Sequence, residues 1–242
     1  MKLTPAAKAI VLINCAVPVA LLGWDGWRGR LGANPATFAI HTTGLLSLIF
    51  LLLSLLITPA RRLTGWNWLF PFRRTFGLYA FFHTLLHFSI FFIFDRALSA
   101  SSTFSEITKR PYLMVGATGL LLMVPLAVTS TNGMIKRLGA KRWKALHRLA
   151  YIAAIAGVVH YYMLVKADVR QPIIFASVLA FLLGYRVVAH YLNLRSSYNK
   201  LRSGPAAPAA ATAPAVSPAA PAGSVPAVPQ ILGRAIEGGS DL

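Results

Sequence analysis

Six long apolar runs constrain this chain more than any other feature. An α-helix rises about 1.5 Å per residue, so about 20 apolar residues cross the hydrocarbon core of a bilayer. Inside that core a helix satisfies its own backbone hydrogen bonds, whereas an irregular segment does not. The runs therefore predict an all-α integral membrane protein, a bundle of six transmembrane helices. We expect these helices at about residues 9–24, 38–58, 76–94, 111–129, 146–165 and 172–192.

Composition agrees with a membrane protein, because 56% of the 242 residues are hydrophobic and only 12% are charged. Soluble domains carry about twice that share of charge. The first run, preceded by Lys2 and Lys8, also has the pattern of a secretory signal peptide. No A-x-A cleavage site follows it, and Trp24 and Trp27 stand where an interfacial aromatic belt would anchor a helix. We therefore interpret it as the first transmembrane helix.

From Ser203 onward the composition changes abruptly. Seven of the fifteen prolines lie in residues 203–242, among alanine, serine and glycine. Such a segment cannot bury enough apolar surface to fold by itself. We expect a transmembrane domain over residues 1–202 and a disordered cytoplasmic tail over residues 203–242.

The net charge of +18 would suit a nucleic-acid-binding protein if the basic residues lined one face. They instead form short clusters between the apolar runs, so we expect no nucleic-acid partner. Fifteen Lys and Arg residues flank the spans on the N-terminal side of the membrane, against seven on the other side. The positive-inside rule therefore predicts that both termini are cytoplasmic.

Histidines mark the candidate site. The third apolar run contains FFHTLLHF, with His83 and His87 on one helix face, and the fifth run ends in GVVHYYM, with His160. A histidine within an apolar span is costly without a partner. His87 and His160 are predicted at similar depths on different helices, as the two axial ligands of a haem would be. The alternative is that these histidines only form hydrogen bonds between helices.

His147, in KRWKALHR, presents a geometric problem. It precedes His160 by thirteen residues, which is about 20 Å along a helix axis and about 220° past three full turns. The two side chains would not share a face, and Arg73 and Arg74, just before the third run, lie at the depth of His147. His147 therefore has several readings: a second haem, a haem propionate, a quinone or a flavin. The surrounding basic residues suit an anionic group.

Other polar residues in the spans have simpler explanations. His41, in the first turn of the second span, is expected to be interfacial, and Arg186 and His190 are expected to snorkel to the membrane surface. One cysteine excludes an internal disulfide and a Cys-ligated iron–sulfur cluster. No G-x-G motif is present, so a self-contained nucleotide-dependent reductase is disfavoured. A metal transporter would need carboxylates along its path, and the spans contain almost none.

Four stretches together resemble a known family. RRTFGLYAFFHTLLH, KRPYLMVG, LAVTSTNGM and KRWKALHRLAYIAAIAGVVHY are similar to the corresponding stretches of the MsrQ (YedZ) family. This family is the haem-binding membrane subunit of the bacterial periplasmic methionine-sulfoxide reductase system, within the ferric-reductase-like transmembrane group. The likeness is clearest over the second to fifth spans. It implies that His87, His147 and His160 are haem-associated, whereas His83 matches no family position.

The resemblance also implies a function. A member of this family would be an electron-transfer subunit of the bacterial inner membrane with haem b and FMN as cofactors. It would take electrons from membrane quinones and pass them to a periplasmic molybdenum-containing catalytic subunit that repairs oxidised envelope proteins. The alternative is a ferric-reductase-like transmembrane reductase fed by a cytosolic flavin reductase.

Overall fold

The computed structural model describes residues 5–202, and the predicted tail at 203–242 lies outside the described residues. The described chain consists of helices joined by turns and contains no strand. Five segments are long and apolar enough to cross a membrane, and a sixth apolar helix, α7, is shorter. This confirms the predicted all-helical membrane architecture. The helices with large apolar runs are α1 (Pro5–Trp27), α2 (Pro35–Thr64), α3 (Phe72–Ile90), α5 (Pro111–Val128), α7 (Leu149–Leu164) and α8 (Arg170–Arg202).

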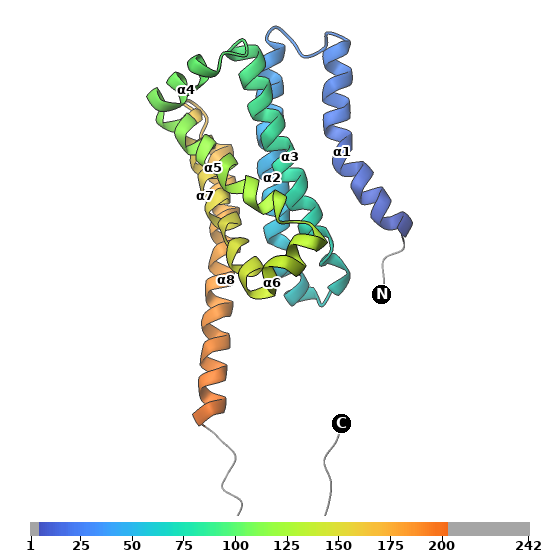
Figure 1. Cartoon of the computed structure of the whole chain (residues 1–242), viewed down its shortest axis with the longest axis vertical. Coiled ribbons are helices and arrows are strands. Elements are labelled where there is room, and N and C mark those ends of the chain that lie inside the picture. Colours follow the sequence, from blue (N-terminus) through green and yellow to red (C-terminus); the bar gives the residue numbers. More distant parts are fainter. Residues whose placement is uncertain (1–4, 203–242) are drawn as a thin grey trace, which may run out of the picture. The chain divides into compact units, whose positions relative to one another are not determined.

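Two segments expected as polar loops are helices. These are α4 (Ala100–Lys109) and α6 (Asn132–Leu146), which lie at opposite ends of the bundle (Figure 1). Each begins with a side-chain cap. The Ser99 hydroxyl accepts a hydrogen bond from the Ser102 N–H, and the Thr131 hydroxyl accepts one from the Met134 N–H. Helix α6 bends at Gly139, whose φ of 74° breaks the helical backbone. Both helices are short and rich in polar residues, so a search for apolar runs misses them.

Helix α3 continues past Ile90 as a π-helical turn, η2 (Phe91–Asp95), and a 3₁₀ turn, η1 (Asn67–Leu69), precedes it. A π-helical turn widens the backbone ring by one residue and is often found beside functional sites. Here it lies directly after the last turn of α3, which carries His87.

Helix α2 does not stop at Pro59, as the sequence suggested, but continues to Thr64 and ends at Gly65, whose φ is 74°. Proline has no N–H, so the carbonyl four residues earlier loses its helical donor. That carbonyl belongs to Leu55, and the Arg186 guanidinium of α8 donates a hydrogen bond to it at 2.5 Å. A neighbouring helix thus supplies the bond that the proline removes, which is how membrane helices tolerate proline. Arg186 therefore points into the bundle and does not snorkel outward.

The core is built from two close helix pairs, α2 with α3 and α5 with α7 (Figure 1). Small residues at the contacts, Ala80 on α3 and Ala154 on α7, are fully buried and let the backbones approach. The Ser47 hydroxyl of α2 donates a hydrogen bond to the Ala80 carbonyl oxygen, with 3.1 Å between the two oxygens. Contacts between the two pairs are fewer, which leaves space between them.

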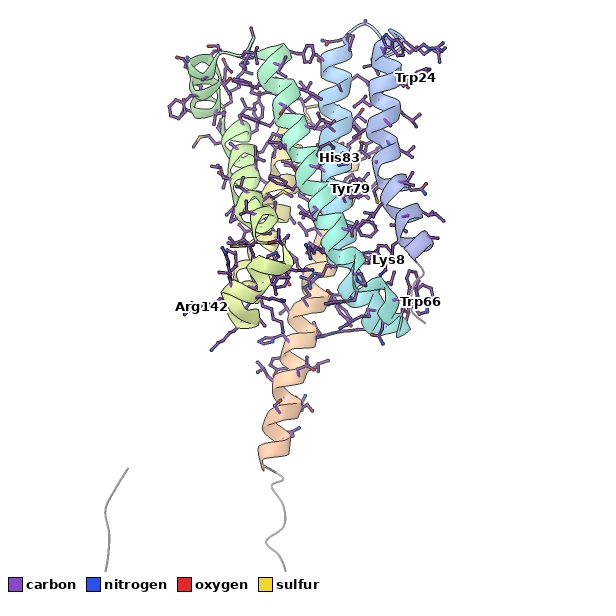
Figure 2. All side chains as sticks on the ribbon, turned by 45° about the vertical axis from the view of Figure 1, so that its right-hand side comes forward. Lys8, Trp24, Trp66, Tyr79, His83 and Arg142 are labelled. Carbon is purple, nitrogen blue, oxygen red and sulfur yellow. The ribbon has the colours of Figure 1, made fainter. Side chains whose placement is uncertain are left out.

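The outer surface of the bundle is largely apolar, as contact with lipid requires. Figure 2 shows Lys8, Trp66 and Arg142 toward one end of the described bundle and Trp24 at the other. Aromatic residues at both ends and an excess of basic residues at one end are the pattern of a membrane-embedded protein. Exposed apolar side chains on the spans include Ile10, Leu21, Leu121, Phe181 and Val187.

Candidate functional site

A cavity of about 280 Å³ occupies the space between the two helix pairs. Its walls are mostly apolar, with Leu48 and Leu51 from α2 and Met123 from α5. It lies toward the α4 end of the bundle, because Ile107 of α4 and Asp95 of η2 also line it. An apolar cleft or cavity with a few polar groups is the usual form of a cofactor site.

His87 and His160 meet at this cavity. Their ring centroids are 6.2 Å apart, and the ring planes are nearly perpendicular, at 88°. His87 lies in the last turn of α3, and His160 lies near the end of α7. The structure therefore brings together the two histidines that the sequence predicted as a pair.

Each ring is fixed by a backbone carbonyl of the partner helix. The Nδ1 atom of His87 lies 2.8 Å from the Ile40 carbonyl oxygen on α2. The Nδ1 atom of His160 lies 2.7 Å from the Tyr112 carbonyl oxygen on α5. A carbonyl oxygen only accepts, so Nδ1 carries the hydrogen in both neutral rings. Nε2 then keeps its lone pair and is the nitrogen available to bind a metal.

The residues of this cavity fit a haem held by two histidines. An imidazole nitrogen binds a metal at about 2 Å, and two rings on opposite sides of one ion are further separated by their own radii. The observed centroid separation of 6.2 Å agrees with that arrangement. The apolar walls suit the faces of a porphyrin. Sequence analysis could not find the Ile40 and Tyr112 carbonyls, because a backbone acceptor has no residue-type signal.

His83 lies away from the cavity, although it is one turn before His87. Its side chain is fully buried, its Nδ1 lies 2.7 Å from the Tyr79 carbonyl oxygen, and its ring centroid is 5.0 Å from that of Phe50. His83 and Tyr79 are both at mid-height on α3 (Figure 2). His41 does line the cavity mouth and is exposed there.

His147 is not brought to the cavity. It lies in the turn between α6 and α7, so the helix expected over 146–165 begins only at Leu149. His147 and His160 are therefore not on one continuous helix, so they need not share a helix face. The His147 ring stacks on Trp143 at 3.9 Å, and its Nε2 is 3.5 Å from the Ser130 hydroxyl. Burial lowers the pKa of His147, and the positive charge of Arg73 lowers it further.

A second cavity, of about 190 Å³, is lined by the side chains of three arginines. Arg62 comes from α2, Arg73 from α3 and Arg186 from α8. The Arg186 guanidinium lies over the Tyr151 ring at 5.2 Å and also donates to the Leu182 carbonyl at 3.1 Å. We call this group the arginine pocket. Its full lining is Thr58, Arg62, Arg73, Tyr151, Tyr185, Arg186, His190 and Asn193.

The arginine pocket has the chemistry of an anion site. None of its described lining residues is acidic, and arginine is the residue best suited to bind phosphate or carboxylate. It lies at the α6 end of the bundle, since the neighbouring Arg74 donates to the Asn132 side chain of α6 at 2.7 Å. The sequence places Arg73 at a depth near that of His147, but it does not indicate Arg62 and Arg186 as neighbours of Arg73. The one available signal was a charged residue within an apolar helix.

Comparison with known proteins gives a consistent result. The family described as "Ferric reductase like transmembrane component" matches residues 43–158. A protein from Rhodospirillum rubrum is 47% identical over 189 residues, which are 78% of this chain and 91% of that protein. One from Herminiimonas arsenicoxydans is 45% identical over 182 residues, 74% of this chain and 84% of that one.

A third relative, from Xanthomonas euvesicatoria pv. vesicatoria, is 42% identical over 209 residues, 84% of this chain and 95% of that protein. All three carry the name protein-methionine-sulfoxide reductase heme-binding subunit MsrQ. Identity of this level over nearly the whole length of the relatives means that the chain belongs to the MsrQ family.

Proposed function

We propose that this protein is a membrane b-type cytochrome subunit that passes electrons from the quinone pool to a periplasmic, molybdenum-containing methionine-sulfoxide reductase subunit. His87 and His160 would hold its haem iron. One observation carries this proposal. Two imidazole rings, with centroids 6.2 Å apart, share an apolar cavity, and each Nδ1 atom is hydrogen-bonded to a backbone carbonyl. The relatives' shared name, with its heme-binding and sulfoxide-reductase terms, supports it.

The residues around the cavity hold and insulate the cofactor. A bound haem supplies reversible one-electron chemistry. The Ile40 and Tyr112 carbonyls keep the histidines in the tautomer with a free Nε2. The apolar walls exclude water, and such a shell tunes the redox potential of the site.

The position of the cavity supports electron flow toward the periplasm. The cavity lies toward the α4 end, and the arginine pocket lies toward the α6 end. Helix α6 carries Lys136, Arg137, Lys141, Arg142 and Lys144, and the positive-inside rule favours the cytoplasmic side of a bacterial inner membrane for this helix and for both termini. In that orientation a haem in the cavity would be near a periplasmic acceptor.

The composition of the arginine pocket is an argument for a second cofactor, FMN. Its three guanidinium groups match the charge of a flavin phosphate and provide several donors for it. An FMN there would lie on the cytoplasmic side of the haem, between the electron source and the outward path. Membrane quinols can reach the protein laterally from the bilayer.

The test uses membranes that contain the full-length protein. Generating quinol in these membranes should produce the absorption bands of reduced haem, and adding the oxidised periplasmic catalytic subunit should reoxidise it. Membranes with the His160→Ala variant are the control and should show neither change. A haem that quinol cannot reduce, or that the catalytic subunit cannot reoxidise, would overturn the proposed route.

A second candidate is a transmembrane reductase fed by a cytosolic flavin reductase. The observation that favours it is the basic α6 end of the bundle, where α6 has exposed residues and lies at the same end as the arginine pocket. Adding a flavin reductase with NADH to quinone-depleted membranes separates the two. If haem is reduced under those conditions and is not reduced by quinol, the cytosolic donor is favoured.

A further inference from the structure

The two helix pairs hold their histidines by the same device. On α2, the Ile40 carbonyl accepts from His87, and Gly44 follows four residues later. On α5, the Tyr112 carbonyl accepts from His160, and Gly116 follows four residues later. Residues four apart lie on one face of a helix. Each helix therefore presents a carbonyl and a glycine to one histidine ring, and we call each such unit a carbonyl–glycine pair.

The glycines are in close contact with the rings. A Cβ atom added to Gly116 would lie 2.7 Å from Nδ1 and 2.9 Å from Cε1 of His160. A Cβ atom added to Gly44 would lie 3.1 Å from Nδ1 and 3.2 Å from Cε1 of His87. Separations below about 3 Å are inside van der Waals contact, so a methyl group at position 116 forces the ring to move. At position 44 the ring must move by a few tenths of an ångström.

The freedom of each ring to move is limited. Its Nδ1 donates to the carbonyl one turn before the glycine, and Nδ1 is also the ring atom that an added Cβ atom would approach most closely. A methyl group on the glycine would therefore push the ring at the atom that holds it, which displaces the ring and strains the hydrogen bond.

We propose that Gly44 and Gly116 are positioning residues that set the orientation of the two axial ligand rings, each through its carbonyl–glycine pair. This inference rests on the proposed function, because it concerns the ligands of the haem iron. Ring orientation and the Nδ1 hydrogen bond act on the electronic structure and potential of a haem through its axial ligands. A perpendicular pair of rings, as seen here, has a characteristic ferric EPR spectrum.

Helix α3 contains a control. A Cβ atom added to Gly77 would lie 3.5 Å from the Ser54 hydroxyl oxygen, which is an ordinary contact, and Gly77 does not line the cavity. The substitution Gly77→Ala thus changes the same residue type in the helix that carries His87 without touching a histidine or the cavity. Any general effect of alanine in a core helix should appear in this variant as well.

The experiment compares purified full-length wild type with Gly116→Ala, Gly44→Ala and Gly77→Ala. Haem per protein, the g-values of the ferric haem and the midpoint potential are measured for each. Gly116→Ala should shift the g-values and the potential and weaken haem retention about 10-fold, as the loss of other outer supports of metal ligands does. Gly44→Ala should give smaller shifts, and Gly77→Ala should match the wild type.

The outcomes are separable. Wild-type protein without a haem band would overturn the proposed function and this inference with it. Wild-type protein with haem, together with g-values unchanged in both Gly116→Ala and Gly44→Ala, would overturn only the positioning role. If Gly116→Ala does not accumulate in membranes, Gly44→Ala decides alone, because its milder contact lets the helix form. Equal shifts in Gly77→Ala and Gly116→Ala would also contradict the inference.

Discussion

At the scale of single residues, the site depends on which nitrogen of each histidine faces the cavity. The sequence indicated His87 and His160, because a histidine in an apolar span signals function and the spans set its depth. It could not indicate the Ile40 and Tyr112 carbonyls, since their approach depends on how neighbouring helices pack. It also did not distinguish the surroundings of His83, which is buried beside Phe50 and Tyr79.

His147 provides a pH prediction at this scale. Its pKa is lowered from 6.5 by burial and by Arg73, so the unfolded protein binds a proton on this group more readily than the folded protein does. The folded protein keeps His147 neutral. It is therefore most stable, as far as this group is concerned, above the pKa of His147 in the unfolded protein, and it loses stability as pH falls below about 6.5. The loss of thermal stability between pH 7.5 and pH 5 should therefore be smaller for His147→Gln than for the wild type. An equal loss in both proteins would contradict the burial seen here.

At the scale of helices, the sequence predicted the apolar spans well and their ends poorly. Hydropathy identifies a span, but α4 and α6 are polar helices that become recognisable only from caps such as Ser99 and Thr131. Helix α2 passes through Pro59 because a distant residue, Arg186, bonds the freed Leu55 carbonyl. Such a long-range compensation has no local sequence signal.

The Pro59 and Arg186 relationship can be measured by a double-mutant cycle. Arg186→Met should lower stability in detergent by about 1–3 kcal/mol, because the buried Leu55 carbonyl loses its donor. Pro59→Ala supplies a backbone N–H at position 59 that can bond the same carbonyl. The cost of Arg186→Met should then be smaller in the Pro59→Ala background. Strictly additive effects would show that the two residues do not share this acceptor.

At the scale of the whole molecule, the cavity and the arginine pocket lie toward opposite ends of the described bundle. The proposed electron path requires this separation, and the direction of that path depends on which end is cytoplasmic. The sequence predicted that direction from charge alone, because basic residues gather at one end whatever the details of the fold. It could not predict the arginine pocket, whose members come from three helices.

Cysteine labelling in intact cells or oriented vesicles tests the direction. Ser101 on α4 and Ala140 on α6 are both exposed, so a cysteine at either position is accessible from its own side. The Ser101→Cys variant should react with a membrane-impermeant thiol reagent from the periplasm, and Ala140→Cys should react only after the membrane is opened. The native Cys15 is buried and serves as the unreactive background. The reverse labelling pattern would overturn the outward path.

The central claim is that His87 and His160 together bind the haem iron. The most direct measurement is the haem content and reduced absorption spectrum of the purified wild type, His87→Ala, His160→Ala and His83→Ala. The first two variants should lose most of their haem, because each leaves the iron with one axial ligand, whereas His83→Ala should keep the wild-type spectrum. Wild-type haem content in both His87→Ala and His160→Ala would contradict the claim.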